Sequence, residues 1–165
     1  MKSALIPMRY ILFLVLVILS SCSSRMQNYI QPDDLQPKLS AAIEKKRQNN
    51  QPVVIQIKSF TDFEWDKFYV FNPYTSAEEV RETLGFDTTL ASHSRIKDND
   101  SHNLLVFVRD DQVAAFIDYP RVEGDFDKLK RRSGYSPAEA VFEVKAEGKN
   151  VYGGEWLRLY PKVAP

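Results

Sequence analysis

The chain contains one cysteine, Cys22, which stands three residues after the end of the apolar run Tyr10–Leu19. A single cysteine forms no disulfide within its own chain. The part of the protein that follows must therefore hold its fold with a hydrophobic core rather than with covalent cross-links. Residues 32–163 have the length of one ordinary domain, and we expect them to form a single unit.

The first 21 residues have the three parts of a secretion signal. Lys2 and Arg9 supply positive charge, the apolar run follows, and Ser20 and Ser21 are the small residues that a signal peptidase requires. The apolar run is shorter than the roughly 20 residues that a membrane-spanning helix needs. We therefore expect a signal peptide over residues 1–21, cleaved between Ser21 and Cys22.

The motif Leu19-Ser20-Ser21-Cys22 resembles the lipobox of bacterial lipoproteins. The resemblance implies a diacylglycerol on the sulfur of Cys22 and an acylated amino group, so that the membrane is a partner through this lipid. In Gram-negative lipoproteins an Asp directly after the cysteine usually retains the protein in the inner membrane. Ser23 stands there, so in such a host the resemblance implies a lipid-anchored envelope protein at the outer membrane, facing the periplasm.

The mature chain is close to electrically neutral. Removing residues 1–21 takes away Lys2 and Arg9 and no acid, which leaves 20 basic and 22 acidic side chains. A protein with this balance has no strong electrostatic attraction to nucleic acid, and we expect no nucleic-acid partner. With Cys22 acylated, no thiol is left to act as nucleophile or metal ligand, and no motif calls for a cofactor.

Residues 22–31 are short and polar and are expected to be a lipidated tether. After them the pattern predicts an α+β domain in the order α-β-β-α-β-β-β-β, because apolar residues recur at helical spacing in two segments and β-branched or alternating runs mark the others. Hairpin-length links favour one antiparallel sheet of five to six strands with two helices on one face. The expected helices are 33–49 and 75–85, and the expected strands are 53–57, 64–71, 104–108, 113–119, 140–147 and 155–160.

The second helix has recognisable ends. Thr75 and Glu78 are spaced as a capping box, in which each side chain bonds a free backbone N–H of the other. Gly85 suits the position after the last turn, where positive φ is common. Residues 86–102 are polar and without period, and we expect a loop there.

Aromatic residues are concentrated between residues 60 and 74. Most should be core, but Trp65, Tyr69 and Tyr74 would form a rigid binding surface if they were exposed together. The stretch Trp65–Thr75 is also similar to a group of small bacterial envelope proteins to which no activity is attached. The hypothesis that follows is a non-enzymatic module that binds a protein partner in the cell envelope or takes part in envelope assembly.

A second hypothesis comes from the alternation of Asp62, Glu64 and Asp66. In an extended strand these carboxylates share one face, which either faces water or meets a basic partner. The second case suggests an immunity protein or inhibitor that blocks an enzyme or toxin. No histidine or further acid stands close enough in sequence to complete a metal site.

Catalytic residues are not expected. His93 and His102 are the only histidines, and their spacing fits no helical zinc pair. A hydrolase would need one of them beside an acid and a serine in a pocket, and no G-x-S-x-G motif supports this. Residues 98–109 begin like a calcium loop, but Asn103 and Arg109 replace its glycine and its final glutamate.

Overall fold

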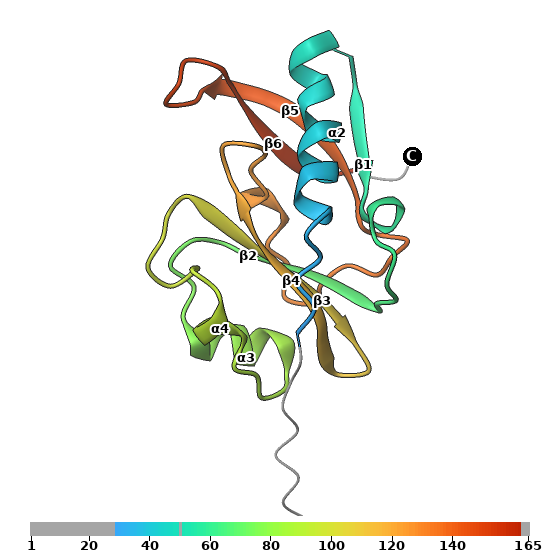
Figure 1. Ribbon diagram of the computed structural model, residues 1–165, viewed down its shortest axis with the longest axis vertical. Coiled ribbons are helices and arrows are strands. Elements are labelled where there is room, and N and C mark those ends of the chain that lie inside the picture. Colours follow the sequence, from blue (N-terminus) through green and yellow to red (C-terminus); the bar gives the residue numbers. More distant parts are fainter. Residues whose placement is uncertain (1–28, 50, 163–165) are drawn as a thin grey trace, which may run out of the picture.

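The computed structural model describes residues 29–49 and 51–162 of the chain (Figure 1). In this part the chain forms two antiparallel three-stranded sheets and three α-helices, which confirms the α+β class. No helix within these ranges is long and apolar enough to span a bilayer. The predicted signal peptide, the predicted cleavage site and Cys22 lie outside the described residues.

The six strands divide into two sheets, which we call sheet A and sheet B. Sheet A has the order β2-β3-β4, with β3 in the centre, and consists of β2 (Lys67–Phe71), β3 (His102–Arg109) and β4 (Gln112–Pro120). Sheet B has the order β1-β5-β6 and consists of β1 (Val53–Gln56), β5 (Val141–Lys149) and β6 (Glu155–Pro161).

The expectation of one continuous sheet was wrong. The two short links do form hairpins, β3–β4 and β5–β6, but β5 pairs with β1 rather than with β4. Pro120 ends β4, and the long connection of residues 121–140 carries the chain across to the other sheet. A short turn forces the two strands that it joins to pair with each other. A connection as long as residues 121–140 leaves open which strand the following one pairs with.

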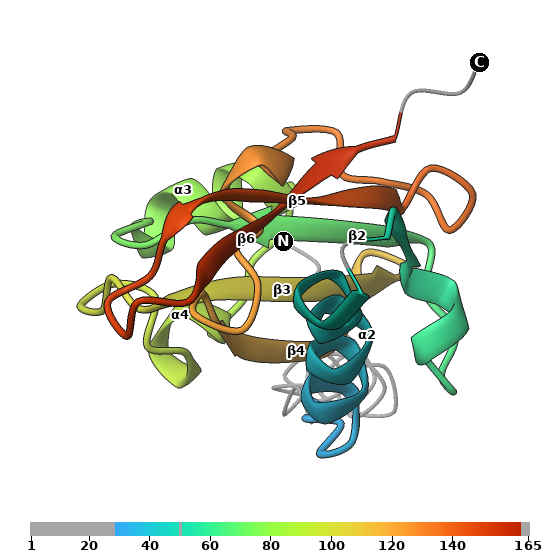
Figure 2. The same ribbon diagram turned by 90° about the horizontal axis from the view of Figure 1, so that it is seen from above.

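The helices do not share one face either, so that expectation was also wrong. Helix α2 (Leu35–Asn49) buries Leu35, Leu39 and Ile43 in the main core, together with residues from both sheets. Helices α3 (Ala77–Leu84) and α4 (Leu90–His93) cover the opposite face of sheet A. Figure 2 shows α2 nearly end-on, with α3 and α4 away from it. Sheet A is therefore buried on both faces.

The N-cap of α3 differs from the prediction by one residue. The helix is capped by Ser76, whose hydroxyl accepts a hydrogen bond from the Glu79 N–H at 3.1 Å. The Thr75 hydroxyl instead donates to the carbonyl of Asn72 at 2.7 Å, which closes the turn before the helix. Gly85 ends α3 with φ of 81°, as predicted.

Two predicted segments have different bounds. The strand expected from residue 64 begins at Lys67, because a 3₁₀ turn at Ile57–Phe60 and an irregular stretch precede it. The loop expected over residues 86–102 contains α4, and it buries Leu90 and Ile96 completely. These two side chains complete the smaller core beneath α3.

The segment before α2 is attached to sheet A. Ile30 forms a parallel bridge to β4 and accepts a hydrogen bond from the Phe116 N–H at 3.1 Å. The ring of Tyr29 packs edge-on against His93 and Phe116, and its hydroxyl accepts from the Thr89 N–H at 3.2 Å. Residues expected to be part of a polar tether are thus joined to the domain from Tyr29 onward.

The contrast between two glycines tests how the connection of residues 121–140 packs. Gly134 and Gly148 both have positive φ, but a Cβ at Gly134 would lie 2.8 Å from the Tyr69 ring, whereas Gly148 faces open space. We expect Gly148→Ala to lower the free energy of unfolding by about 1 kcal/mol through φ alone. Gly134→Ala should lower it by roughly 2–4 kcal/mol because overpacking is added. Equal losses in urea denaturation would contradict this packing.

Candidate interaction surface

Strand β6 presents three large side chains on the face of sheet B that points away from the core. Leu157 and Leu159 are buried at 1% and 0% exposure, so the alternate residues Trp156, Arg158 and Tyr160 lie on the other face, where each is half-buried. We call these three residues the aromatic face. Trp, Tyr and Arg are the residue types that most often dominate the free energy of binding at protein interfaces.

A buried carboxylate supports the aromatic face from below. The backbone of Asp125 extends sheet B next to β6, donating to the Leu157 carbonyl at 2.8 Å and accepting from the Leu159 N–H at 2.9 Å. The Asp125 side chain is 0% exposed and lies opposite Arg158. A fully buried carboxylate is tolerated only when hydrogen bonds and opposite charge compensate for lost hydration.

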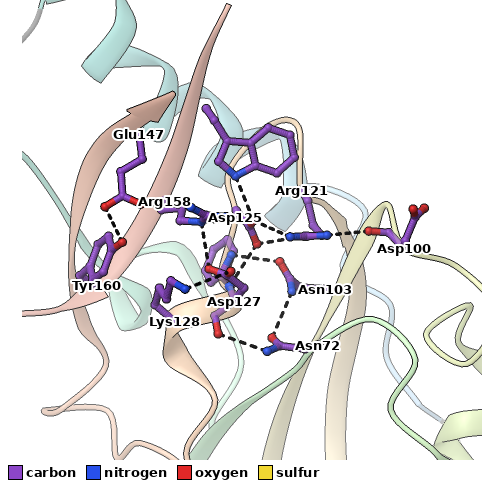
Figure 3. Close-up of polar contacts among 12 residues, drawn as sticks. Asn72, Asp100, Asn103, Arg121, Asp125, Asp127, Lys128, Glu147, Arg158 and Tyr160 are labelled. Carbon is purple, nitrogen blue, oxygen red and sulfur yellow. Dashed lines mark hydrogen bonds and ion pairs between the residues drawn. The ribbon is translucent and has the colours of Figure 1, made fainter. Parts of the chain in front are cut away.

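Three side chains supply the hydrogen bonds and positive charge that compensate for the lost hydration of the Asp125 carboxylate (Figure 3). Arg121 donates to both oxygens of Asp125, at 3.1 Å from Nε and 2.8 Å from Nη2. The indole N–H of Trp156 donates to the same carboxylate at 3.0 Å. The guanidinium of Arg158 adds an ion pair at 3.7 Å. The orientation of two residues of the aromatic face is therefore set by one buried acid.

Arg158 and Tyr160 are also held by Glu147 from strand β5. Arg158 Nη1 lies 3.1 Å from Glu147, and the phenol of Tyr160 donates to the same carboxylate at 2.6 Å. This hydrogen bond to a carboxylate raises the pKa of Tyr160 to about 12. The ammonium of Lys145 lies 5.1 Å from the centre of the Tyr160 ring, within cation–π range.

Two asparagines connect this network to sheet A. Asn103 of β3 is 0% exposed, and its carbonyl oxygen accepts from the Phe126 N–H at 3.0 Å. Asn72 donates to the carbonyl of Asp127 at 3.2 Å, and the two asparagine side chains meet at 3.5 Å. Figure 3 shows these contacts below Asp125, so the network spans from sheet B to sheet A.

The β5–β6 hairpin ends in a turn at Asn150–Gly154, which we call the apical turn. Its two central side chains, Val151 and Tyr152, are 85% and 83% exposed. The turn is nevertheless well ordered by hydrogen bonds, because the Asn150 side chain accepts from the N–H groups of Tyr152 at 2.9 Å and Gly154 at 3.0 Å. Two apolar side chains are thus displayed on a preorganised turn.

The binding surface predicted from the aromatic cluster is wrong. Trp65 is 2% exposed and donates its indole N–H to Thr61 at 3.0 Å, and Tyr69 is 9% exposed. Only Tyr74 is exposed, at 66%, on a turn where its φ is 64°. Trp65 was expected in an extended strand, but it lies in the irregular stretch before β2 and packs into the main core.

The acidic residues do not share a strand face. Asp62, Glu64 and Asp66 are exposed on the irregular stretch before β2, where Glu64 pairs with Lys58 at 3.2 Å. The Asp66 side chain accepts from the Asp110 N–H at 3.0 Å, which joins this stretch to the turn of the β3–β4 hairpin. Asp66 is therefore joined to the β3–β4 turn by a loop contact, and the three carboxylates do not line one face of a strand.

Of the two histidines, His102 is brought together with a serine and an acid at a cleft, the grouping that a hydrolase would need, although the sequence has no G-x-S-x-G motif. His93 packs on Tyr29, while His102 lines a polar cleft of about 300 Å³ together with Asp118 and Arg95. Burial raises the pKa of the Asp118 carboxyl. Nδ1 of His102 lies 3.1 Å from the hydroxyl of the adjacent Ser101. Within residues 29–49 and 51–162 no three His, Cys, Asp or Glu side chains are grouped to hold a metal ion.

The sequence did not lead us to predict the aromatic face or the apical turn as a surface site, although each has a recognisable sequence pattern. Trp156, Arg158 and Tyr160 alternate with two leucines, which is the period of a half-buried strand. Val151 and Tyr152 stand between Asn150 and two glycines, where turns normally carry polar residues. An apolar pair in such a turn indicates a role outside the core.

Comparison of the chain with family models, with curated proteins and with solved structures finds no match in any of the three.

The role of the buried acid is tested by Asp125→Ala. Removing the carboxylate leaves Arg121, Arg158 and the Trp156 indole without their common partner, and breaking a buried ion pair costs roughly 3–5 kcal/mol. We expect a loss of that size in chemical denaturation. Asp100→Ala, at an exposed acid in a nearby loop, should change stability by no more than about 0.5 kcal/mol. Comparable effects of the two changes would contradict a central role for Asp125.

The Tyr160–Glu147 hydrogen bond is tested by Glu147→Gln. The change should return the pKa of Tyr160 from about 12 toward its ordinary value of 10, because the neutral amide no longer favours the protonated phenol. Since folding raises this pKa, the contribution to stability is complete below pH 10 and is lost as the pH rises through 12. An NMR titration of the Tyr160 ring measures the shift, and an unchanged pKa would contradict the assignment.

Proposed function

We propose that the protein is a lipid-anchored lipoprotein of the bacterial cell envelope whose domain is a non-enzymatic, protein-binding module in envelope assembly. The lipobox-like motif ending at Cys22 supports the anchor, and Ser23 supports the outer membrane in a Gram-negative host. Two or more acyl chains on one residue give stable membrane attachment.

The observation that carries the binding role is the display of Val151 and Tyr152. Adjacent exposed apolar side chains indicate an interaction site more strongly than scattered ones, and Val151 and Tyr152 are neighbours on one turn. Here the turn is fixed by hydrogen bonds from its own Asn150, so a partner would not have to order it on binding. The aromatic face continues the surface along β6 with three further residues of the types that favour interfaces.

The anchor is tested with two matched changes in the full-length chain, expressed in a Gram-negative host with labelled fatty acid. Cys22→Ala should abolish incorporation of the label and release the protein from the membrane fraction. Ser23→Asp should keep the label but move the protein from the outer to the inner membrane fraction. Label on Cys22→Ala, or a membrane distribution that neither change alters, would refute the proposed anchor.

An inhibitor or immunity role is the second candidate, and the exposed carboxylates before β2 and in the β3–β4 turn favour it. Asp62, Glu64 and Asp66 precede β2 and Asp110 and Asp111 stand in the turn; all five are exposed, and the Asp66 side chain joins the two segments by accepting from the Asp110 N–H. An acidic patch would attract a basic enzyme or toxin, with association that weakens as salt is added. Binding through the apolar apical turn would depend little on salt, so the salt dependence of partner binding separates the two roles.

A further inference from the structure

A polar cleft opens at the edge of strand β4, where the segment before α2 leaves sheet A. We call it the β4 cleft, and its volume is about 300 Å³, at the lower end of the range for small-molecule sites. Figure 2 shows β4 between α4 and the start of α2. The wall of the cleft correspondingly includes Gln36 from the first turn of α2, Arg95 from the loop after α4 and Asp118 from β4.

Pro32 ends the pairing of the segment before α2 with β4. The Ile30 N–H donates to the Ala114 carbonyl at 3.3 Å, and the Ile30 carbonyl accepts from the Phe116 N–H at 3.1 Å. In a parallel ladder the next residue to pair stands two positions further along the chain, and that residue is Pro32. Proline has no N–H to donate, and the Pro32 carbonyl accepts from the Leu35 N–H instead, at 3.2 Å. The segment therefore turns away from β4 at this point.

The backbone groups that a paired residue would have met are the Phe116 carbonyl and the Asp118 N–H. They face the open edge, because the Phe116 N–H bonds Ile30 there and alternate residues of a strand present their backbone groups to the same side. Among the described residues, no backbone group bonds either of them from this side. Phe116 and Ile117 are 1% and 8% exposed, so they line the cleft mainly with backbone atoms.

The open part of the edge is short. Toward the start of β4 it is closed by Ile30, and toward the end of β4 the next residue to face this edge is Pro120, which again has no N–H. One acceptor and one donor remain between these two positions. They suit the backbone of a single extended residue rather than a long added strand.

Charged side chains of both signs surround these two backbone groups. The half-buried Asp118 carboxylate accepts from the Arg95 N–H at 3.2 and 3.4 Å, and burial raises its pKa. Asp33 adds a second carboxylate to the wall, while the Arg95 side chain and His102 supply basic groups. In the described part of the chain none of these four side chains is engaged in an ion pair. Both an ammonium and a carboxylate group would therefore find an opposite charge in the cleft.

The parallel ladder gives a bound residue its direction. The carboxyl end of that residue points along β4 toward Pro120, which pairs with His102 of β3. Arg95 lies near the same end, because its N–H bonds the Asp118 side chain. The amino end points the opposite way, and Asp33 is the acid of the cleft that remains for an ammonium group.

From these groups we propose that the β4 cleft binds a dipeptide with both ends free. The second residue of the dipeptide pairs with β4, its N–H donating to the Phe116 carbonyl and its carboxylate accepting from the Asp118 N–H. The carboxylate also meets Arg95 and His102, and the ammonium of the first residue meets Asp33. This activity goes beyond the proposed envelope role and depends neither on the anchor nor on the aromatic face.

The first step of the test is titration calorimetry of the full-length protein in detergent, with the dipeptide L-Ala-L-Ala as the probe. We expect saturable binding of one dipeptide per chain. Ala-Ala amide and N-acetyl-Ala-Ala should each bind at least about tenfold more weakly, because each loses a hydrogen-bonded charge. Absence of heat with Ala-Ala would overturn the proposal. Equal affinity of the acetylated peptide would also overturn it, since that result indicates the carboxyl end of a longer chain, a second copy of this protein included.

The second step assigns the two ends of the dipeptide. Arg95→Gln should weaken the Kd of Ala-Ala at least about tenfold and leave that of its amide unchanged. Asp33→Asn should weaken Ala-Ala similarly and leave N-acetyl-Ala-Ala unchanged. Arg132→Gln, at an exposed arginine outside the cleft, is the matched control and should leave every Kd unchanged.

A merely structural role of these side chains gives a different result. Because neither Arg95 nor Asp33 forms an ion pair within the described residues, both variants should keep the melting temperature of the unaltered protein. If Arg95→Gln weakened Ala-Ala and its amide equally, the arginine would not meet the carboxylate, and the proposal would fail.

Discussion

The arrangement of the two sheets depends on one buried carboxylate. Asp125 extends sheet B through its backbone and, through its side chain, holds residues from the connection and from β6. Its loss of hydration is large, so the protein must supply several donors and positive charge at one point. That requirement fixes where residues 121–127 lie, and with them the path by which the chain passes from sheet A to sheet B.

The same requirement explains why a solvent-facing surface is rigid. Side chains on an exposed sheet face normally sample several rotamers, and ordering them on binding costs free energy. Trp156 and Arg158 are held by Asp125, and Tyr160 by Glu147, before any partner arrives. A polar network below the surface thereby fixes the aromatic side chains above it, which is the preorganisation that a binding surface would require.

Local patterns predicted local structure well. The stripe of Leu35, Leu39 and Ile43 identified α2, and both β-hairpins followed from short polar turns between apolar runs. Sheet membership depended instead on Asp125 and Tyr135, single residues in a long connection that bond to β6 and β2. A repeating sequence pattern cannot predict such bridges, because each of them involves only one residue of the connection.

The candidate surface was not predicted from its sequence patterns for a related reason. Trp65 and Tyr152 are both aromatic residues near turns, and composition alone does not say which one is buried. The difference comes from long-range packing: Trp65 meets Phe68 and Phe107 in the core, whereas the β5–β6 hairpin extends beyond the elements that could cover Tyr152. Burial at this level is a property of the whole fold rather than of the segment.

The bridge between Ile30 and β4 has a consequence for the solution behaviour of the domain. An uncovered edge strand offers free N–H and C=O groups to other chains and promotes aggregation. Ile30 bonds two of these groups on β4, the Ala114 carbonyl and the Phe116 N–H, and Tyr135 bonds the two groups of Phe68 on β2. A truncation that begins at α2 would keep every helix and strand of the fold, yet it would leave the β4 edge open and favour edge-to-edge association. The few residues before α2 thus protect part of the β4 edge of sheet A from pairing with another chain.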